Sequence, residues 1–185
     1  ADCTGLTSIT IPNSVESIGH DAFLGCTSLT SINVARGNNY YSGNNGVLFN
    51  KKKTELIRYP EGKSQTSYTI PNSVTSIGEM AFLCCTGLTS ITILDSVTSI
   101  GACAFADCTG LTSITIPDSV TSIGYGTFDG CTGLTSITIP NSVTSIEDAA
   151  FDGCASLKDV YYTGSKDEWK AISIGEYNGC LLNAT

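Results

Sequence analysis

Hydrophobic side chains recur along this chain in a fixed order that repeats every 23 residues. One copy begins at Cys108 and reads CTGLTSITIPDSVTSIGYGTFDG, and closely similar copies begin at Cys85 and Cys131. Apolar and polar residues alternate from Ser113 to Ile116, which predicts a short strand with its isoleucines pointing inward. A unit copied at a period of 20 to 50 residues is typical of a solenoid.

The rest of each copy predicts how the coil closes. Pro117 ends the strand because proline has no N–H to donate. A second, shorter extended piece carries Val120 and Ile123 inward, and a tight helical turn around Phe128 leads to the next copy. Seven buried side chains contribute about 1.5–3 kcal/mol each, whereas ordering the coil costs about 1.5 kcal/mol per residue. A single coil therefore has to stack on its neighbours.

The period divides the chain into units of one expected domain, residues 1–185. The regular repeats are 3–25, 62–84, 85–107, 108–130 and 131–153, with an extended repeat at 26–61 and a C-terminal cap at 154–185. The extended repeat is 13 residues longer than the period. Within it, residues 47–49 and 56–59 flank a lysine-rich turn and predict an exposed β-hairpin with a basic tip, preceded by a turn-rich loop at 38–46.

Charge is distributed unevenly between these units. The formal net charge is −8, yet six of the nine cations fall between residues 36 and 63, and residues 64–157 contain none. The acidic regular repeats argue against a nucleic-acid-binding face. The extended repeat would offer a positive patch with exposed tyrosines, and its candidate binding residues are Lys51, Lys52, Lys53, Arg58, Tyr40 and Tyr41, with Tyr59 beside them. The alternative is that a lysine-rich turn only keeps a hairpin soluble and prevents edge pairing.

Six of the nine cysteines share one repeat position and should form a ladder. Side chains in register on adjacent coils point the same way at about 4.8 Å spacing, which does not suit a disulfide. We expect buried free thiols that pack as small hydrophobic groups. No Cys or His spacing is typical of zinc, and the redox states of Cys84, Cys103 and Cys180 stay open.

The repeat pattern LxxIxIPxxVxxIGxxAFxxC resembles the BspA-like class of leucine-rich repeats over nearly the whole chain. The extended repeat is similar to a variant of that class, YxSxxGVLFNKxxTxLIxYPxG. This resemblance implies an α/β solenoid: a right-handed horseshoe or arc with a parallel concave sheet and short extended segments and helical turns opposite. It also implies a cell-surface or secreted location and a role in adhesion. No catalytic residues come with the resemblance.

On the concave sheet, the outward positions of each strand are almost all hydroxyl residues. The candidate binding positions are Ser90, Thr92, Ser113, Thr115, Ser136 and Thr138. Short polar side chains can support broad, weak contact with a protein or glycan, although the regular strands carry no aromatic or arginine anchor. Alternatively, these residues are present because Ser and Thr suit a β-surface.

The two ends differ. Residues 165–168 read Ser-Lys-Asp-Glu, a capping box that predicts a short helix carrying Trp169 as a lid on the last coil. The first repeat has no such cap, so we expect either further repeats upstream or end-to-end self-association. The lone histidine, His20, occupies a variable repeat position, and Asn183 opens the only N-glycosylation sequon.

The sequence favours a non-enzymatic interaction module of a surface or secreted protein, with a protein or glycoprotein partner. We expect no cofactor, no metal, no nucleic acid and no membrane insertion. No phosphate-binding loop is present, and adjacent carboxylate pairs lie where turns or helix starts are expected. The alternative is a structural spacer that only separates other parts of a larger protein.

Overall fold

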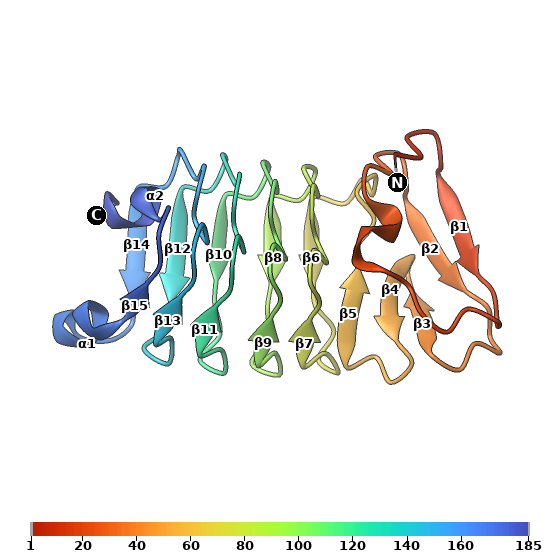
Figure 1. Cartoon of the computed structure of the whole chain (residues 1–185), viewed down its shortest axis with the longest axis horizontal. Coiled ribbons are helices and arrows are strands. Elements are labelled where there is room, and N and C mark those ends of the chain that lie inside the picture. Colours follow the sequence, from red (N-terminus) through yellow and green to blue (C-terminus); the bar gives the residue numbers. More distant parts are fainter. Residues whose placement is uncertain (1, 185) are drawn as a thin grey trace.

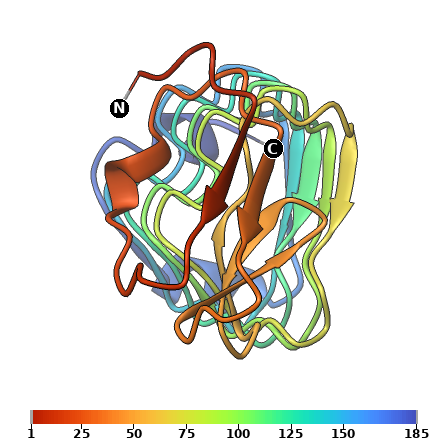
Figure 2. The same ribbon diagram turned by 90° about the vertical axis from the view of Figure 1, so that its right-hand side faces the viewer.

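The computed structural model describes residues 2–184 and forms a parallel β-solenoid of about seven turns (Figure 1). One long sheet runs along the column with strand order β14-β12-β10-β8-β6. Its strands are β6 (Ser67–Thr69), β8 (Ser90–Thr92), β10 (Ser113–Thr115), β12 (Ser136–Ile139) and β14 (Asp159–Tyr162). Ser113 pairs with Ser136, one period later, so the repeat places equivalent residues side by side. Figure 2 looks along the column and shows the successive coils superimposed.

A second row of two-residue strands runs along another side of the column. These strands are β7 (Ser76–Ile77), β9 (Ser99–Ile100), β11 (Ser122–Ile123), β13 (Ser145–Ile146) and β15 (Ser173–Ile174). Turns connect the rows and use left-handed residues at two repeat positions. These residues are Met80, Cys103, Gly126 and Ala149 at the first position, and Cys84, Asp107, Gly130 and Gly153 at the second.

Helices are few among the described residues: η1 (His20–Phe23), α1 (Lys166–Ala171) and α2 (Gly179–Leu182). The predicted solenoid with a parallel sheet is confirmed, whereas the helical turns expected between the strands are mostly hydrogen-bonded turns and do not confirm the α/β class. The right-handed arc stays a prediction.

The core of the regular coils consists of ladders of identical side chains. Phe82, Phe105, Phe128 and Phe151 stack with ring centroids 5.2–5.4 Å apart, and Tyr59 extends the stack at 5.3 Å from Phe82. The cysteine ladder runs beside it. The thiols of Cys108, Cys131 and Cys154 each donate to the carbonyl of the phenylalanine 26 residues earlier, at 3.1 Å. The six ladder cysteines are free thiols, as predicted, although Cys3 is exposed. Cys84, Cys103 and Cys180, for which the sequence makes no prediction, are free thiols as well.

The extended repeat forms an antiparallel meander of β3 (Tyr41–Asn44), β4 (Val47–Asn50) and β5 (Glu55–Arg58), and β5 then pairs in parallel with β7. The predicted β4–β5 hairpin is present, but the predicted loop at 38–46 contains a strand. The hairpin is not an exposed projection either. Val47 and Phe49 are fully buried in the core of the regular coils, whereas Leu48 is fully buried in a separate core. The meander therefore separates two hydrophobic cores.

The smaller core belongs to the first coil, which carries β1 (Ser8–Ile11) paired with β2 (Ser31–Val34). Its side chains at the outer end, Leu6, Ile9, Val15 and Ile18, are only half-buried, whereas their equivalents in inner coils are buried. One buried residue ties the extended repeat to this coil: the Asn38 amide donates to the carbonyls of Pro12 and Val15 and accepts from the N–H groups of Tyr40 and Tyr41.

At the other end, α1 begins with the capping box that the sequence predicts. The Ser165 hydroxyl accepts from the Glu168 N–H, and the Glu168 carboxylate accepts from the Ser165 N–H at 2.7 Å. Trp169 is half-buried and packs at 5.3 Å from the Tyr162 ring. The buried Asn178 fixes the final turn, because its side chain accepts from the Phe151 N–H and donates to the Glu147 carbonyl.

Candidate functional site

The outer face of the long sheet carries the hydroxyl positions named from the sequence. Ser90, Thr92, Ser113 and Thr115 are exposed, and Ser136 and Thr138 are half-buried. The parallel register places the serines in one row and the threonines in another. On β14 these rows end in Asp159 and Tyr161, and Tyr161 is 59% exposed. The face therefore has an aromatic residue at its C-terminal end, where its smooth hydroxyl surface stops.

The basic turn of the extended repeat lies at the surface, but not all of its predicted residues do. Lys51 and Lys52 are exposed, and Lys53 is half-buried in a left-handed conformation with φ 56°. The Lys51 ammonium donates to the Asn38 carbonyl. Tyr40 is 46% exposed, whereas the half-buried Tyr41 donates its hydroxyl to the Glu16 carbonyl at 3.4 Å. The structure thus places these five candidates on the extended repeat, next to the first coil and apart from the hydroxyl face.

Two residues expected on this patch are buried instead. Tyr59 is 1% exposed because it occupies the phenylalanine position of the aromatic stack. Arg58 is 3% exposed, donates to the Met80 carbonyl at 2.6 Å, and forms an ion pair with Glu61 at 2.5 Å. Burial raises the pKa of Glu61, although Arg58 beside it acts in the opposite direction. Arg58 and Tyr59 therefore hold the coils together and are not available to a partner.

Burial also controls the titration of the ladder thiols. It raises the pKa of Cys85, Cys108, Cys131 and Cys154 well above that of a free cysteine. Thiolates, rather than thiols, react as nucleophiles and bind metals. Burial likewise raises the pKa of Tyr68 to about 12. This chemistry suits packing, and among residues 2–184 no group of three or more His, Cys, Asp or Glu side chains could hold a metal ion.

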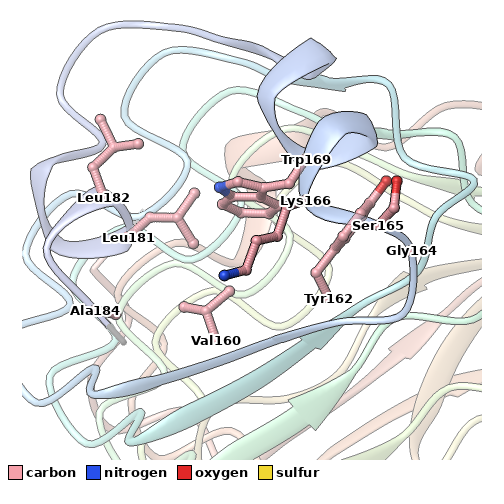
Figure 3. A pocket seen from close by; sticks show the side chains of 9 residues that line it. All are labelled: Val160, Tyr162, Gly164, Ser165, Lys166, Trp169, Leu181, Leu182 and Ala184. Atoms are coloured by element: carbon pink, nitrogen blue, oxygen red, sulfur yellow. The ribbon is translucent and has the colours of Figure 1, made fainter.

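Two of the cavities formed by the described residues were not predicted from the sequence. The larger, of about 370 Å³, lies at the C-terminal end of the column between α1, α2 and β14 (Figure 3). Trp169, Tyr162, Val160 and Leu181 line it, and Figure 3 shows the Lys166 side chain extending into it. The concentration of apolar residues in the last unit could have predicted an apolar cavity there.

The smaller cavity, of about 230 Å³, lies where the first coil meets the meander; we call it the seam cavity. Its lining residues are Ile18, Gly19, His20, Phe23, Tyr41, Asn50, Glu55, Ile57, Arg58, Gly78 and Glu79. The His20 ring lies 3.5 Å from the Glu79 carboxylate across it. These residues are up to 61 positions apart, so no local pattern could have grouped them.

The model of the BspA type leucine rich repeat region matches residues 1–61 and 58–177 in six copies. The chain belongs to this family. The resemblance seen in the repeat pattern is thereby confirmed, and the chain is a leucine-rich repeat protein of the kind associated with protein interaction.

Solved structures of leucine-rich repeat proteins match the BspA-type fold of this chain. A leucine rich cell surface protein from Faecalibacterium prausnitzii is 36% identical over 91% of this chain and 51% of its own, with a TM-score of 0.72. A leucine-rich repeat protein from Eubacterium ventriosum is 29% identical over 84% of this chain and 48% of its own, with a TM-score of 0.67. The pneumococcal vaccine antigen PcpA is 23% identical over 97% of this chain and 53% of its own, with a TM-score of 0.74, and so shows likeness of fold alone.

This chain spans about half the length of those structures. No curated protein matches it. Across residues 2–184, no helix has the length and apolar character needed to cross a membrane.

Proposed function

We propose that this BspA-type chain is a non-enzymatic interaction module of a cell-surface or secreted protein. It would bind proteins of a host, a matrix or a neighbouring cell, as an adhesin does. The observation that carries this proposal is the outer face of the long sheet, where rows of Ser and Thr hydroxyls on four parallel strands end in the exposed Tyr161 on β14. The match to a cell-surface leucine-rich repeat protein supports the location.

The test is a binding screen against extracellular matrix proteins with the parent chain and a variant carrying Ser90→Arg, Ser113→Arg and Ser136→Arg. Three arginines on this face should block a broad contact, so we expect binding to fall at least tenfold. The matched control places arginine at Ser99, Ser122 and Ser145, which lie on the row of short strands. Equal affinity of the parent and the first variant would exclude the long-sheet face.

The basic turn is a second candidate surface for an acidic or glycan-bearing partner. Replacing Lys51 and Lys52 by Ala and Lys53 by Gly removes three charges, and glycine suits the left-handed backbone of Lys53. We expect weaker binding whose loss shrinks at high salt. A partner bound equally well by this variant does not use the turn.

The alternative function is a structural spacer of a larger surface protein. The observation that favours it is the near identity of the exposed positions in the coils between residues 85 and 153. The test is deletion of one 23-residue coil, which shortens the column. If the larger protein still binds its partner equally well after this deletion, the result favours the spacer over the binding module.

A further inference from the structure

The seam cavity is set apart from the rest of the molecule by the meander that separates the two hydrophobic cores. One wall comes from the first coil, through Ile18, His20 and Phe23, and the other comes from β3, β4 and β5. Ligand sites are preferentially found where two packed units meet. This cavity lies within the chain and does not depend on either end.

The floor of the seam cavity is apolar and its rim is polar. Phe23 is buried, and Ile18 and Ile57 are half-buried beside it. Around this floor, Glu55 and Glu79 offer carboxylate acceptors and His20 can both donate and accept, whereas the Asn50 amide is already bonded to Thr54 and to the Glu55 N–H. The Glu55 carboxylate has no hydrogen-bond or ion-pair partner among the described residues.

Arg58 contributes to the same lining but offers no accessible donor. The residue is 3% exposed, both of its terminal nitrogens are bonded, and its Nε is buried too deeply to meet a ligand. The groups that a ligand can reach are therefore the two carboxylates, His20 and the apolar floor. They fit an occupant that both donates and accepts hydrogen bonds and that has an apolar face.

We propose that the seam cavity binds one neutral hexose unit of a glycan. Sugar hydroxyls donate to Glu55 and Glu79 in charge-assisted hydrogen bonds and accept from His20, while the C–H face of the ring packs on Ile57 and Phe23. Glu55 and Glu79 repel an acidic sugar. This site is distinct from the protein-binding face proposed above, and it can be tested without knowing any protein partner.

The experiment is saturation-transfer NMR followed by titration with methyl α-D-mannopyranoside, methyl β-D-galactopyranoside and N-acetyl-D-glucosamine. For a ligand of about a dozen heavy atoms we expect a Kd of about 1 mM. N-acetylneuraminic acid serves as the acidic counterpart and should not bind. N-acetyl-lysine amide tests the rival occupant, a basic side chain held by the two carboxylates.

Two kinds of variant locate the binding. A Cβ at Gly19 meets no heavy atom within 4 Å, so Gly19→Phe can fill the mouth of the cavity without disturbing the coil. It should abolish the NMR signal, and Glu55→Gln should raise Kd about fivefold. The control is Asp95→Asn, which removes one exposed carboxylate from a regular coil and restores the residue found at the same repeat position at Asn72 and Asn141.

Circular dichroism shows whether each variant is folded. If Gly19→Phe does not fold, the test rests on the Kd of Glu55→Gln. Binding of a neutral hexose that both variants weaken and Asp95→Asn leaves unchanged supports the proposal. No binding of any neutral sugar at 50 mM would overturn it. Binding of N-acetyl-lysine amide alone would also overturn it and would assign the cavity to a basic side chain.

Discussion

The regular coils between residues 62 and 153 bury side chains by repetition, whereas the extended repeat at 26–61 relies on a few specific polar contacts. In the regular coils, each phenylalanine stacks on its copy and each ladder thiol donates to the coil before it. At the extended repeat, the buried Arg58–Glu61 pair and Asn38 hold neighbouring coils together instead. Repetition spreads stability over many equivalent contacts, and interruption concentrates it in single residues.

The largest expected effect is alkaline unfolding of the regular coils. Because burial raises the pKa of Cys85, Cys108, Cys131 and Cys154, these thiols stay protonated in the folded chain while the unfolded chain ionises above about pH 8.5. The unfolded state then binds fewer protons, so the free energy of unfolding falls as pH rises. At pH 9.5 each thiol costs about 1.4 kcal/mol, and the four together about 5–6 kcal/mol.

Urea unfolding under reducing conditions at pH 7.0, 8.5 and 9.5 measures this loss. Cys108→Ala lowers stability at pH 7 but should reduce the slope between pH 8.5 and 9.5 by about a quarter. A slope that is unchanged in this variant would show that the ladder thiols do not cause the alkaline loss.

The next effect sharpens the comparison at the extended repeat. Glu61→Ala leaves the buried Arg58 guanidinium without its carboxylate and should cost about 3–5 kcal/mol of unfolding free energy. The double variant Arg58→Met with Glu61→Leu removes both charges and should recover most of this loss. If the double variant is as unstable as Glu61→Ala, the pair contributes through shape rather than charge.

Asn38 provides a smaller test in the same unit. Asn38→Ala removes two hydrogen bonds to the carbonyls of Pro12 and Val15 and leaves the N–H groups of Tyr40 and Tyr41 without an acceptor. We expect a loss of about 1–3 kcal/mol, because the remaining partners are left unsatisfied. The matched control is the exposed neighbour Asn39→Ala, which should change stability by less than about 0.5 kcal/mol. Hydrogen exchange should show that the loss is greatest in the first coil.

The same contrast explains what the sequence could predict. In the regular coils every position occurs in several copies, so the strands, the inward isoleucines and the buried thiols can all be predicted from the period. The extended repeat occurs in one copy, so no second copy supports its interpretation. Its run Val47-Leu48-Phe49 has no polar alternation, and a continuous apolar run is typical of a strand buried on both faces. That pattern indicates a buried strand, whereas the lysines of the turn indicate an exposed hairpin, and the prediction of an exposed hairpin rests on the lysines alone.

The candidate sites show the same contrast between repeated positions, which the sequence predicts, and positions set by tertiary packing, which it does not. The hydroxyl face was predictable because each strand alternates, and its binding role stays a prediction. Arg58 was misplaced because its buried partner Glu61 and the Met80 carbonyl are fixed by tertiary packing and not by local sequence. The seam cavity was missed for a related reason, since His20 and Glu79 meet only after the meander has folded between their coils.

The smallest expected effect concerns a position where the repeat itself is imperfect. Asp107 has φ 55° at a left-handed place that Gly130 and Gly153 occupy in later coils. Left-handed backbone costs a non-glycine residue about 1 kcal/mol or more, and the greater entropy of glycine in the unfolded chain offsets part of the gain. Asp107→Gly should therefore raise the free energy of unfolding by a few tenths of a kcal/mol, up to about 1 kcal/mol.

Asp118→Gly is the control for this substitution, because Asp118 is also exposed and lacks a positive φ. There the same replacement only adds entropy to the unfolded chain, so stability should fall. Opposite signs at these two aspartates would show that the regular coils, although built by repetition, still contain strained copies that a more uniform sequence would relieve. If the free energy of unfolding changes in the same direction for both variants, backbone strain does not explain why glycine occupies this position in the later coils.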